Sequence, residues 1–366
     1  MAELRIEQLL REMVNRKASD LHLRVGVPPV YRINGALQRL FDVRIDAAMM
    51  DAFLDDIMNR DQKQRFEANK ECDFAVGARD MGRFRVNVFR QRGSIAVVIR
   101  HIKAKIPAFE ELHLPEVIRD LALTKRGLVL VTGTTGSGKS TTLASMIDYI
   151  NQKESVNVIT VEDPIEYLYK DNVAIISQRE IGVDTLSYAN ALRAALRQDP
   201  DVLLVGEIRD LETMQIALTA ADTGHMVFAT IHTTNAVETI HRVLSMYPPH
   251  QHDEVRLLLA EVLAGIISLR LLPTKDGKGR VPAAEILVNT GAIKEYIQDK
   301  NKIDMVEQAV AEGHIQYHSQ TFDQALLELY QNEQISLETA MNAATNRDDF
   351  DLKIRGISGT SDRGWM

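Results

Sequence analysis

The stretch GTTGSGKS, residues 133–140, decides the fold. It fits the pattern G-x-x-x-x-G-K-[ST], and it lies between the apolar run GLVLV and a segment of helical character. Glycines let backbone N–H groups turn toward phosphate oxygens, and the amino end of the following helix adds positive potential there. A chance glycine loop is the alternative, and the complete motif in this context argues against it. The stretch therefore predicts a phosphate-binding loop.

The residues of this loop are the predicted binding site for ATP with Mg²⁺. Lys139, expected to be exposed in the loop, should reach the β- and γ-phosphates, and Ser140 should ligate Mg²⁺. The other predicted nucleotide-binding positions are Gly133, Thr134, Thr135, Gly136, Ser137, Gly138 and Thr141.

A carboxylate at the end of another apolar strand is the predicted catalytic group. The segment DPDVLLVGEIRD, residues 199–210, places Glu207 at the carboxyl edge of the sheet, where open α/β sheets bind ligands. Glu207 could polarise the attacking water or hold Mg²⁺ through a bound water. Many P-loop enzymes have a magnesium-binding Asp where this chain has Gly206, so the direct metal ligands beyond Ser140 stay open. A solvated surface Glu is the alternative, and the P-loop upstream outweighs it.

Two further groups of polar residues could join this site. Glu162, Asp163 and Glu166 follow the strand VNVITV, and three carboxylates at one sheet edge repel unless a cation neutralises them. His225 and His232 bracket the strand MVFATI, so both could sense or orient phosphate. Solvated loop acids and structural histidines are the alternatives, and the residues alone do not decide.

Strands and helices alternate around these motifs. The apolar strands are separated by helical segments near 187–197 and 211–222, which predicts a largely parallel sheet covered by helices. After about residue 250 the chain is expected to be mainly helical.

The first hundred residues have a different pattern. Helical spacing covers 4–17 and 47–69, alternating strand patterns begin at Leu21, and GRFRVNVFRQRGSIAVVIRHI predicts a hairpin with its turn at 91–94. Prolines at 107 and 115 suit a linker. The prediction is thus an α/β protein with a small α+β domain at 1–110 and an ATPase domain at 111–366 whose last part is helical.

Arginines of the first domain are a further candidate for catalysis. Arg85 shares one predicted strand face with Arg83 and Asn87, and Arg100 follows on the next strand. An arginine delivered from a separate domain or subunit can neutralise the charge of phosphoryl transfer. A solvated strand face is the alternative, which the pattern does not dismiss.

Composition limits the class of protein. The 366 residues carry a formal net charge of −8, which does not suggest a general nucleic-acid binder, although a local basic stripe stays open. The single cysteine, Cys72, excludes an intrachain disulfide and a cysteine-rich zinc site. A charged amino terminus and the absence of an apolar run of ~20 residues predict a cytoplasmic protein.

Taken in order, the motifs resemble the secretion ATPase superfamily, and specifically the type IV pilus retraction ATPases of twitching motility. The resemblance covers nearly the whole chain, through SDLHL, FRVNVF, GTTGSGKSTT, ITVEDPIEY, ALRQDPDVLLVGEIRDLET, ALTAADTGH and ATIHTTNA. It implies a PAS-like amino-terminal domain and a RecA-like ATPase domain, assembled as a homohexamer. It also implies a pilus platform protein of the inner membrane as partner, no nucleic acid, and membrane association at the inner face only through partners.

The same resemblance implies roles for single residues. Glu207 matches the catalytic Walker B glutamate, Glu166 the aspartate-box acid, and His225 with His232 the histidine box. Arg85 and Arg100 match arginines that approach the phosphates as the domains close.

Comparison within the superfamily favours retraction. Pilus-assembly and type II secretion ATPases usually carry an extra amino-terminal region and a four-cysteine zinc module, which this chain lacks. One segment departs from the retraction pattern: AIKEYIQD, residues 292–299, stands where AIRNLIRE is common. An accessory retraction ATPase, or a relative powering another filament or secretion system, therefore stays open.

Two other classes of function fit the sequence less well than the motor. A RecA-like nucleic-acid translocase shares the P-loop but should offer a basic channel or stacking aromatics, and aromatics are only 5% of this chain. A non-hydrolysing scaffold would need a damaged phosphate site, whereas Lys139, Ser140 and Glu207 are all present.

Overall fold

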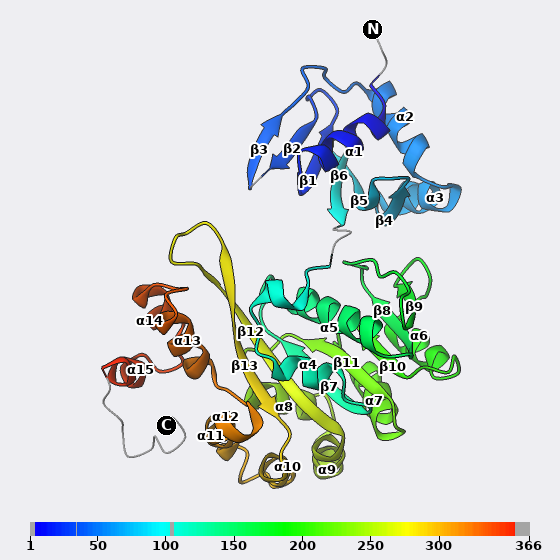
Figure 1. The fold of residues 1–366 in the computed structure, drawn as a ribbon. Helices are drawn as coiled ribbons and strands as arrows, with labels where there is room; N and C mark the ends of the chain where they lie inside the picture. Colours follow the sequence, from blue (N-terminus) through cyan, green and yellow to red (C-terminus); the bar gives the residue numbers. More distant parts are fainter. Residues whose placement is uncertain (1–3, 34, 103–105, 356–366) are drawn as a thin grey trace. The chain divides into compact units, whose positions relative to one another are not determined.

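The chain forms two compact units that divide near residue 105. The structure is a computed structural model that describes residues 4–33, 35–102 and 106–355 (Figure 1). The elements of the first unit are α1 (Ile6–Asn15), β1 (Asp20–Arg24), β2 (Val30–Ile33), β3 (Ala36–Arg39), α2 (Ala47–Ile57), α3 (Arg60–Asn69), β4 (Glu71–Ala78), β5 (Gly82–Gln91) and β6 (Ser94–Ile102).

The first unit is an antiparallel sheet covered by helices. Its strand order is β3-β2-β1-β6-β5-β4, and every pairing is antiparallel. Phe84, Val86 and Val88 of β5 are fully buried, whereas Arg85 between them is exposed. The alternation predicted for this strand is therefore confirmed, and the hairpin turn lies between Gln91 and Ser94 as expected.

The second unit carries a larger sheet with helices on its faces. Its elements are η1 (Phe109–Leu112), α4 (Val117–Ala122), β7 (Gly127–Thr132), α5 (Lys139–Lys153), β8 (Asn157–Glu162), β9 (Ile175–Glu180), α6 (Tyr188–Ala195), β10 (Val202–Val205), α7 (Leu211–Asp222), β11 (Met226–Ile231), α8 (Ala236–Ser245), η2 (Pro249–Gln251), α9 (His252–Val262), β12 (Leu263–Pro273), β13 (Arg280–Val288), α10 (Gly291–Gln298), α11 (Met305–Glu312), α12 (His314–Tyr317), α13 (Phe322–Gln331), α14 (Leu337–Ala343) and α15 (Arg347–Ile354).

The order of this sheet is β13-β12-β7-β11-β10-β8-β9, and only the β12–β13 pair is antiparallel. The expected largely parallel sheet is thus confirmed. Side-chain caps explain where several covering helices begin. Ser187, Asp210 and Asn235 each accept a hydrogen bond from the backbone N–H three residues on, which satisfies a donor at the start of α6, α7 and α8.

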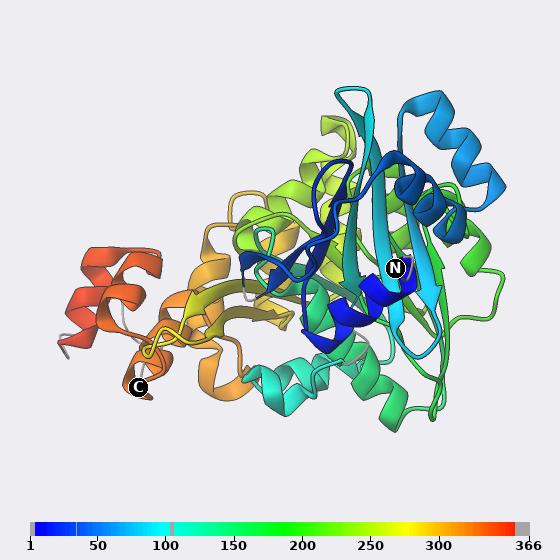
Figure 2. The same ribbon diagram turned by 90° about the horizontal axis from the view of Figure 1, so that it is seen from above.

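The expectation of a mainly helical chain after residue 250 is wrong in one respect. Two long strands, β12 and β13, follow α9, and Figures 1 and 2 show the hairpin that they form running out toward α13 and α14. The first strand is a nearly continuous apolar run, which periodicity does not distinguish from a buried helix. The second contains Pro282, which a strand tolerates at a sheet edge, and β13 is the edge strand.

A buried carboxylate joins this hairpin to the rest of the sheet. Glu285 of β13 accepts hydrogen bonds at Oε1 from the backbone N–H of Ala236, at 2.6 Å, and from Ser268 Oγ, at 3.5 Å. Ser268 Oγ in turn accepts a hydrogen bond from Thr132, at the end of β7. Burial raises the pKa of Glu285 to about 7, an effect that the N–H of Ala236 partly offsets.

No helix among the described residues is long and apolar enough to cross a lipid bilayer.

Replacing Glu285 by Gln should remove a pH-dependent loss of stability. The folded-state pKa of about 7 lies above the ordinary 4.5, so the folded chain prefers the protonated acid. The contribution of protonated Glu285 to the free energy of unfolding is fully present below pH 4.5. Up to about 3 kcal/mol of it is lost as the pH rises through 7. Urea unfolding at pH 5.5 and pH 8 measures it. Glu338→Gln, at an exposed position, is the control, and an unchanged pH dependence in Glu285→Gln would contradict the assignment.

Candidate active site

Neighbouring parallel strands bring several of the predicted residues to one edge of the second sheet. In the order β7-β11-β10-β8, each pair is parallel and in register, so all four strands end at the same edge. The P-loop follows β7, His232 follows β11, Glu207 follows β10, and Asp163 follows β8. This is the carboxyl edge, where open α/β sheets bind ligands.

The P-loop has the backbone geometry that phosphate binding requires. Gly133, Gly136 and Gly138 have φ values of +138°, +81° and +105°, which side chains with a Cβ rarely adopt. At Gly133 a Cβ would also collide with Ser137 and lie only 2.5 Å from the carbonyl oxygen of Leu269. The fifteen-residue helix α5 begins at Lys139, so its amino end supplies unsatisfied N–H groups beside the loop.

The lysine of the loop is not exposed as expected. Lys139 is only 9% exposed, and its Nζ donates to the carbonyl oxygens of Gly133 and Thr134, at 2.7 and 3.0 Å. An ammonium is a strong donor with three hydrogens, and the loop's own carbonyls are the nearest acceptors. The side chain of Lys139 thus folds back over the P-loop, where it is predicted to bind the phosphates of ATP.

The loop fits a triphosphate by its donors. Ser137 Oγ is buried and has no hydrogen-bond partner among the described residues, although buried hydroxyls are usually paired. Ser140 and Thr141, in the first turn of α5, are half-buried rather than enclosed. Lys139, Ser137 and the first N–H groups of α5 would hold the phosphates, and Ser140 would ligate the Mg²⁺ that accompanies ATP as substrate.

Glu207 and His232 lie together beside this loop. His232 Nε2 is 3.4 Å from Glu207 Oε1, while the guanidinium of Arg209 donates to Glu207 Oε2 at 2.6 Å. That hydrogen bond, opposed by partial burial and aided by the charges of Arg209, His232 and Lys139, lowers the pKa of Glu207. The carboxylate is therefore ionised at neutral pH, which suits a group that orients a water more than a strong general base.

The structure explains the glycine at position 206. A Cβ there would lie 3.0 Å from the Tyr188 hydroxyl and 3.1 Å from the backbone of β8. In addition, the Gly206 carbonyl accepts a hydrogen bond from Thr230 Oγ1 at 2.6 Å. An Asp at this position would displace its neighbours, so the chain offers Glu207 at this edge instead.

The acidic cluster after β8 separates into residues with different surroundings. Glu162 Oε1 accepts hydrogen bonds from Thr160 Oγ1, at 2.6 Å, and from Gln178 Nε2, at 3.2 Å. Asp163 and Glu166 are exposed in the loop that follows. The three carboxylates thus share a loop, but Glu162 is held by neutral donors.

His225 lies at the opposite edge of the sheet from His232. It precedes β11, and its Nδ1 is 2.9 Å from the carbonyl oxygen of Ala220 and 3.2 Å from Thr223 Oγ1. A six-residue strand separates the two histidines, which is about 20 Å. The structure therefore brings His232, and not His225, to the P-loop of the same chain.

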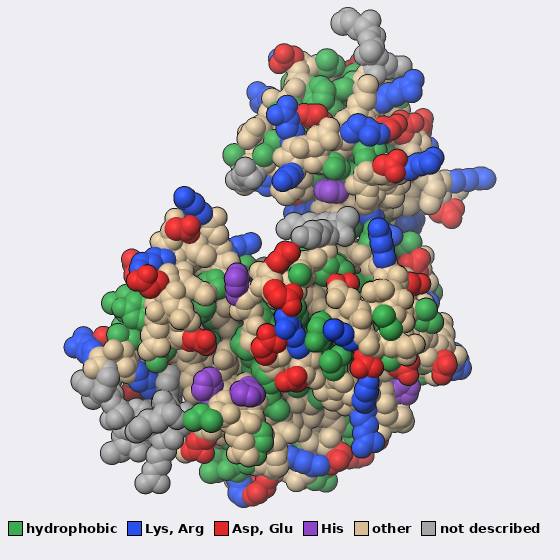
Figure 3. Space-filling model, in the orientation of Figure 1, with side chains coloured by type: hydrophobic (Ala, Val, Ile, Leu, Met, Phe, Trp, Pro, Cys, Tyr) green, Lys and Arg blue, Asp and Glu red, His purple; other side chains and the backbone are tan. Residues whose placement is uncertain are grey.

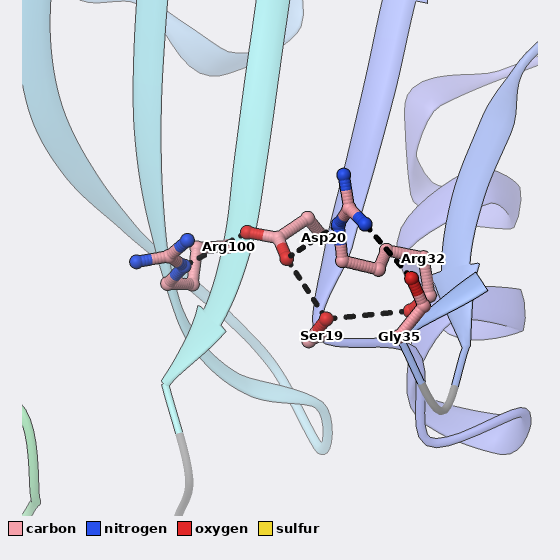
Figure 4. Close-up of polar contacts among 5 residues, drawn as sticks. All are labelled: Ser19, Asp20, Arg32, Gly35 and Arg100. Atoms are coloured by element: carbon pink, nitrogen blue, oxygen red, sulfur yellow. Dashed lines mark hydrogen bonds and ion pairs between the residues drawn. The ribbon is translucent and has the colours of Figure 1, made fainter. Parts of the chain in front are cut away.

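The predicted arginines lie side by side in the first unit. Arg85 and Arg100 are direct partners across β5 and β6, on the exposed face of the sheet. Arg85 Nε is 3.8 Å from Asp73 Oδ1, and Arg100 Nε donates to Asp20 Oδ1 at 2.8 Å (Figure 4).

Two residues of the site were missed from the sequence alone. Arg209 pairs with Glu207, and Tyr188 places its hydroxyl against Gly206. The spacing of Arg209, two residues after Glu207, could have indicated the pair. Tyr188 lies on α6, and no local sequence pattern predicts its contact with Gly206.

Charges of both signs are interspersed over the described residues on the face in Figure 3, and no continuous basic stripe is visible there. Among the described residues, no group of three or more His, Cys, Asp or Glu side chains is arranged to hold a metal ion.

A P-loop between a buried parallel strand and a helix, with an ionised glutamate two strands away at the same sheet edge, defines a P-loop ATPase. The chain belongs to the family of type II/IV secretion system proteins, whose pattern it matches over residues 1–351. It is a secretion-family ATPase.

Individual relatives of similar length indicate which secretion-family ATPases this chain resembles. The chain is 41% identical over 352 residues to the type IV pilus ATPase PilU of Pseudomonas aeruginosa, covering 96% of this chain and 92% of PilU. It is 43% identical over 345 residues to the type IV pilus retraction ATPase PilT of the same organism, covering 94% and 99%. A crystal structure of the pilus retraction motor PilT with bound ADP superposes with a TM-score of 0.89 at 47% identity, covering 94% and 98%.

Lys139→Ala is expected to reduce ATP hydrolysis by about 100-fold or more, since it removes a charge directed at the transferring phosphate. The fold should persist, because the alanine leaves α5 intact and the lost hydrogen bonds lie within one loop. Steady-state turnover and a melting curve measure both effects. Lys153→Ala, at the other end of the same helix, is the control, and turnover retained in Lys139→Ala would contradict the loop assignment.

Glu207→Gln is expected to bind Mg-ATP normally and to hydrolyse it about 100- to 10,000-fold more slowly. The amide keeps the shape of the side chain but loses the charge that orients water. Nucleotide titration and single-turnover kinetics separate the two steps. Glu254→Gln, on the exposed face of α9, is the control. If binding and hydrolysis were lost together, Glu207 would be a nucleotide-holding residue.

Proposed function

We propose that this chain is a motor that hydrolyses Mg-ATP to power type IV pilus retraction. The observation that supports it most is the match, over nearly its full length, to proteins named as pilus retraction ATPases. The ADP in the PilT crystal structure supports a nucleotide as the ligand of this P-loop. The proposed assembly is a homohexamer at the inner face of the cytoplasmic membrane, acting on a platform protein of the pilus.

The residues have distinct proposed roles in this cycle. The P-loop and Lys139 hold the phosphates, Ser140 ligates Mg²⁺, and Glu207 orients the attacking water with His232 beside it. Mg-ATP supplies the γ-phosphoryl group and the metal charge that stabilises its transfer. Arg209 keeps Glu207 ionised and fixed in orientation, because its hydrogen bond is to the carboxylate form.

Residues away from the carboxyl edge of the second sheet are proposed to act between domains or subunits. Arg85 and Arg100 are proposed to neutralise phosphate charge during transfer, as arginines supplied from another domain or subunit do. His225 lies at the opposite edge of the sheet from the P-loop of the same chain, so its proposed role depends on the assembled ring. Glu166, exposed in the loop after β8, is proposed to act as the acid of the aspartate box.

An accessory retraction ATPase is the second candidate. Identity to PilU and to PilT is nearly equal, at 41% and 43%. The segment AIKEYIQD forms α10, in which Ile293 and Ile297 are buried while Glu295 is exposed. Its departures from the retraction pattern thus include the exposed side, where they would alter a docking surface rather than the core.

Deletion of the gene and imaging of labelled pili tests the proposal. Filaments should become longer and retraction events should cease, and the wild-type gene should restore them whereas Glu207→Gln should not. Retraction that fails only under load, or only when a second retraction ATPase is also absent, identifies the accessory role. Retraction unchanged in both backgrounds would contradict the proposal.

A further inference from the structure

We propose that Asp20 is a positioning residue for Arg100: it holds the guanidinium through Nε and presents the two terminal nitrogens to a phosphate oxyanion. The inference rests on the proposed role of Arg100 at the nucleotide. It adds a residue, on a different strand, through which that arginine is oriented.

The register of the first sheet assembles the cluster. Arg100 of β6 is the direct partner of Asp20 on β1, and Asp20 is the direct partner of Arg32 on β2. Arg85 of β5 flanks Arg100 on its other side. Three arginines and one carboxylate therefore stand in a row across four strands, and like charges on neighbouring strands are unfavourable without a counter-charge.

The contacts give Asp20 a fixed orientation. Its Oδ1 accepts the hydrogen bond from Arg100 Nε at 2.8 Å, and its Oδ2 accepts one from Ser19 Oγ at 2.8 Å. Arg32 Nε lies 3.8 Å from the same Oδ2, and Arg32 is itself tied to the carbonyl oxygen of Gly35. The side chain of Asp20 is only 7% exposed, so it cannot swing away from the row.

The same contacts leave the guanidinium end of Arg100 exposed to solvent. The hydrogen bond to Asp20 uses Nε, and Figure 4 shows a terminal nitrogen of the guanidinium extending away from the carboxylate. The side chain of Arg100 is 66% exposed. A planar fork with both outer nitrogens presented is the arrangement that binds phosphate oxygens bidentately.

Charge keeps this arrangement in place at neutral pH. Burial by itself raises the pKa of Asp20, but the hydrogen bonds from Ser19 and Arg100 and the charge of Arg100 outweigh it and lower the pKa. Asp20 is thus ionised whenever the motor works. A pair with so exposed an arginine contributes little to stability, which leaves orientation as the main consequence.

The neighbouring arginine provides an internal comparison. Arg85 is also approached at Nε by a carboxylate, Asp73, but at 3.8 Å and with both side chains about half exposed. That contact is looser, so Arg85 is held less firmly than Arg100.

A double-mutant cycle on the full-length protein tests the inference. Arg100→Ala should lower kcat by about 10- to 1,000-fold. Asp20→Asn should lower kcat by about 10-fold with little change in nucleotide affinity, because a misdirected arginine affects transfer more than binding. The double variant should turn over no more slowly than Arg100→Ala alone. Asp55→Asn, which breaks an exposed ion pair with Lys63 in the same unit, is the matched control.

The possible outcomes separate the inference from the function on which it rests. Full activity of Arg100→Ala would overturn both the role of that arginine and its positioning by Asp20. A double variant slower than Arg100→Ala by the full Asp20→Asn factor would overturn the positioning alone, as would faster turnover in Asp20→Asn. If Asp20→Asn does not fold, Ser19→Ala, at an exposed position, removes one hydrogen bond to Asp20 and should lower kcat a few-fold only when Arg100 is present.

Discussion

The parallel register of β7, β11 and β10 is the constraint on which the site depends. Because Ile231 pairs with Thr132 and Val205 with Ala229, the three strands end within a residue or two of one another. The P-loop, His232 and Glu207 are consequently neighbours, although nearly seventy positions separate Lys139 from Glu207 in the sequence. A slip of one strand by two residues, about 7 Å along the sheet, would move the site residue at its end away from the other two.

Two glutamates of the second unit show how surroundings assign different charge states. Glu207 receives a hydrogen bond from an arginine, which lowers its pKa and keeps it ionised. Glu285 is enclosed by β12, β13 and α8, and burial raises its pKa toward neutrality. The ionised carboxylate of Glu207 is suited to orient a water molecule beside a phosphate. The protonated acid of Glu285 is suited to form hydrogen bonds that join neighbouring elements of the sheet. The joint reaches Thr132, immediately before the P-loop, so the hairpin beyond residue 262 also supports the loop.

Much of the fold and part of the site could be predicted from the sequence. Local patterns sufficed where strands alternate strictly, as at Phe84 to Val88, and where a motif implies its own surroundings, as at the P-loop. They failed for β12, whose apolar run has no period, and for the exposure of Lys139, whose side chain is buried and donates to backbone carbonyls of its own loop. The contacts of Tyr188 with Gly206 and of Asp20 with Arg100 join elements distant in the chain, and such contacts are set by tertiary structure. Arg209 lies only two residues after Glu207, so its pairing was within reach of the sequence. The proposed catalytic roles remain predictions from the sequence.

A structure of the full chain with Mg²⁺ and a non-hydrolysable ATP analogue tests the central claim most directly. The account predicts that Lys139 Nζ leaves the carbonyl oxygens of Gly133 and Thr134 for the β- and γ-phosphates, and that Glu207 lies one water molecule from the γ-phosphate. A nucleotide bound elsewhere, or a Lys139 that stays on its own loop with the phosphates beyond its reach, would contradict the assignment of this sheet edge as the site of hydrolysis.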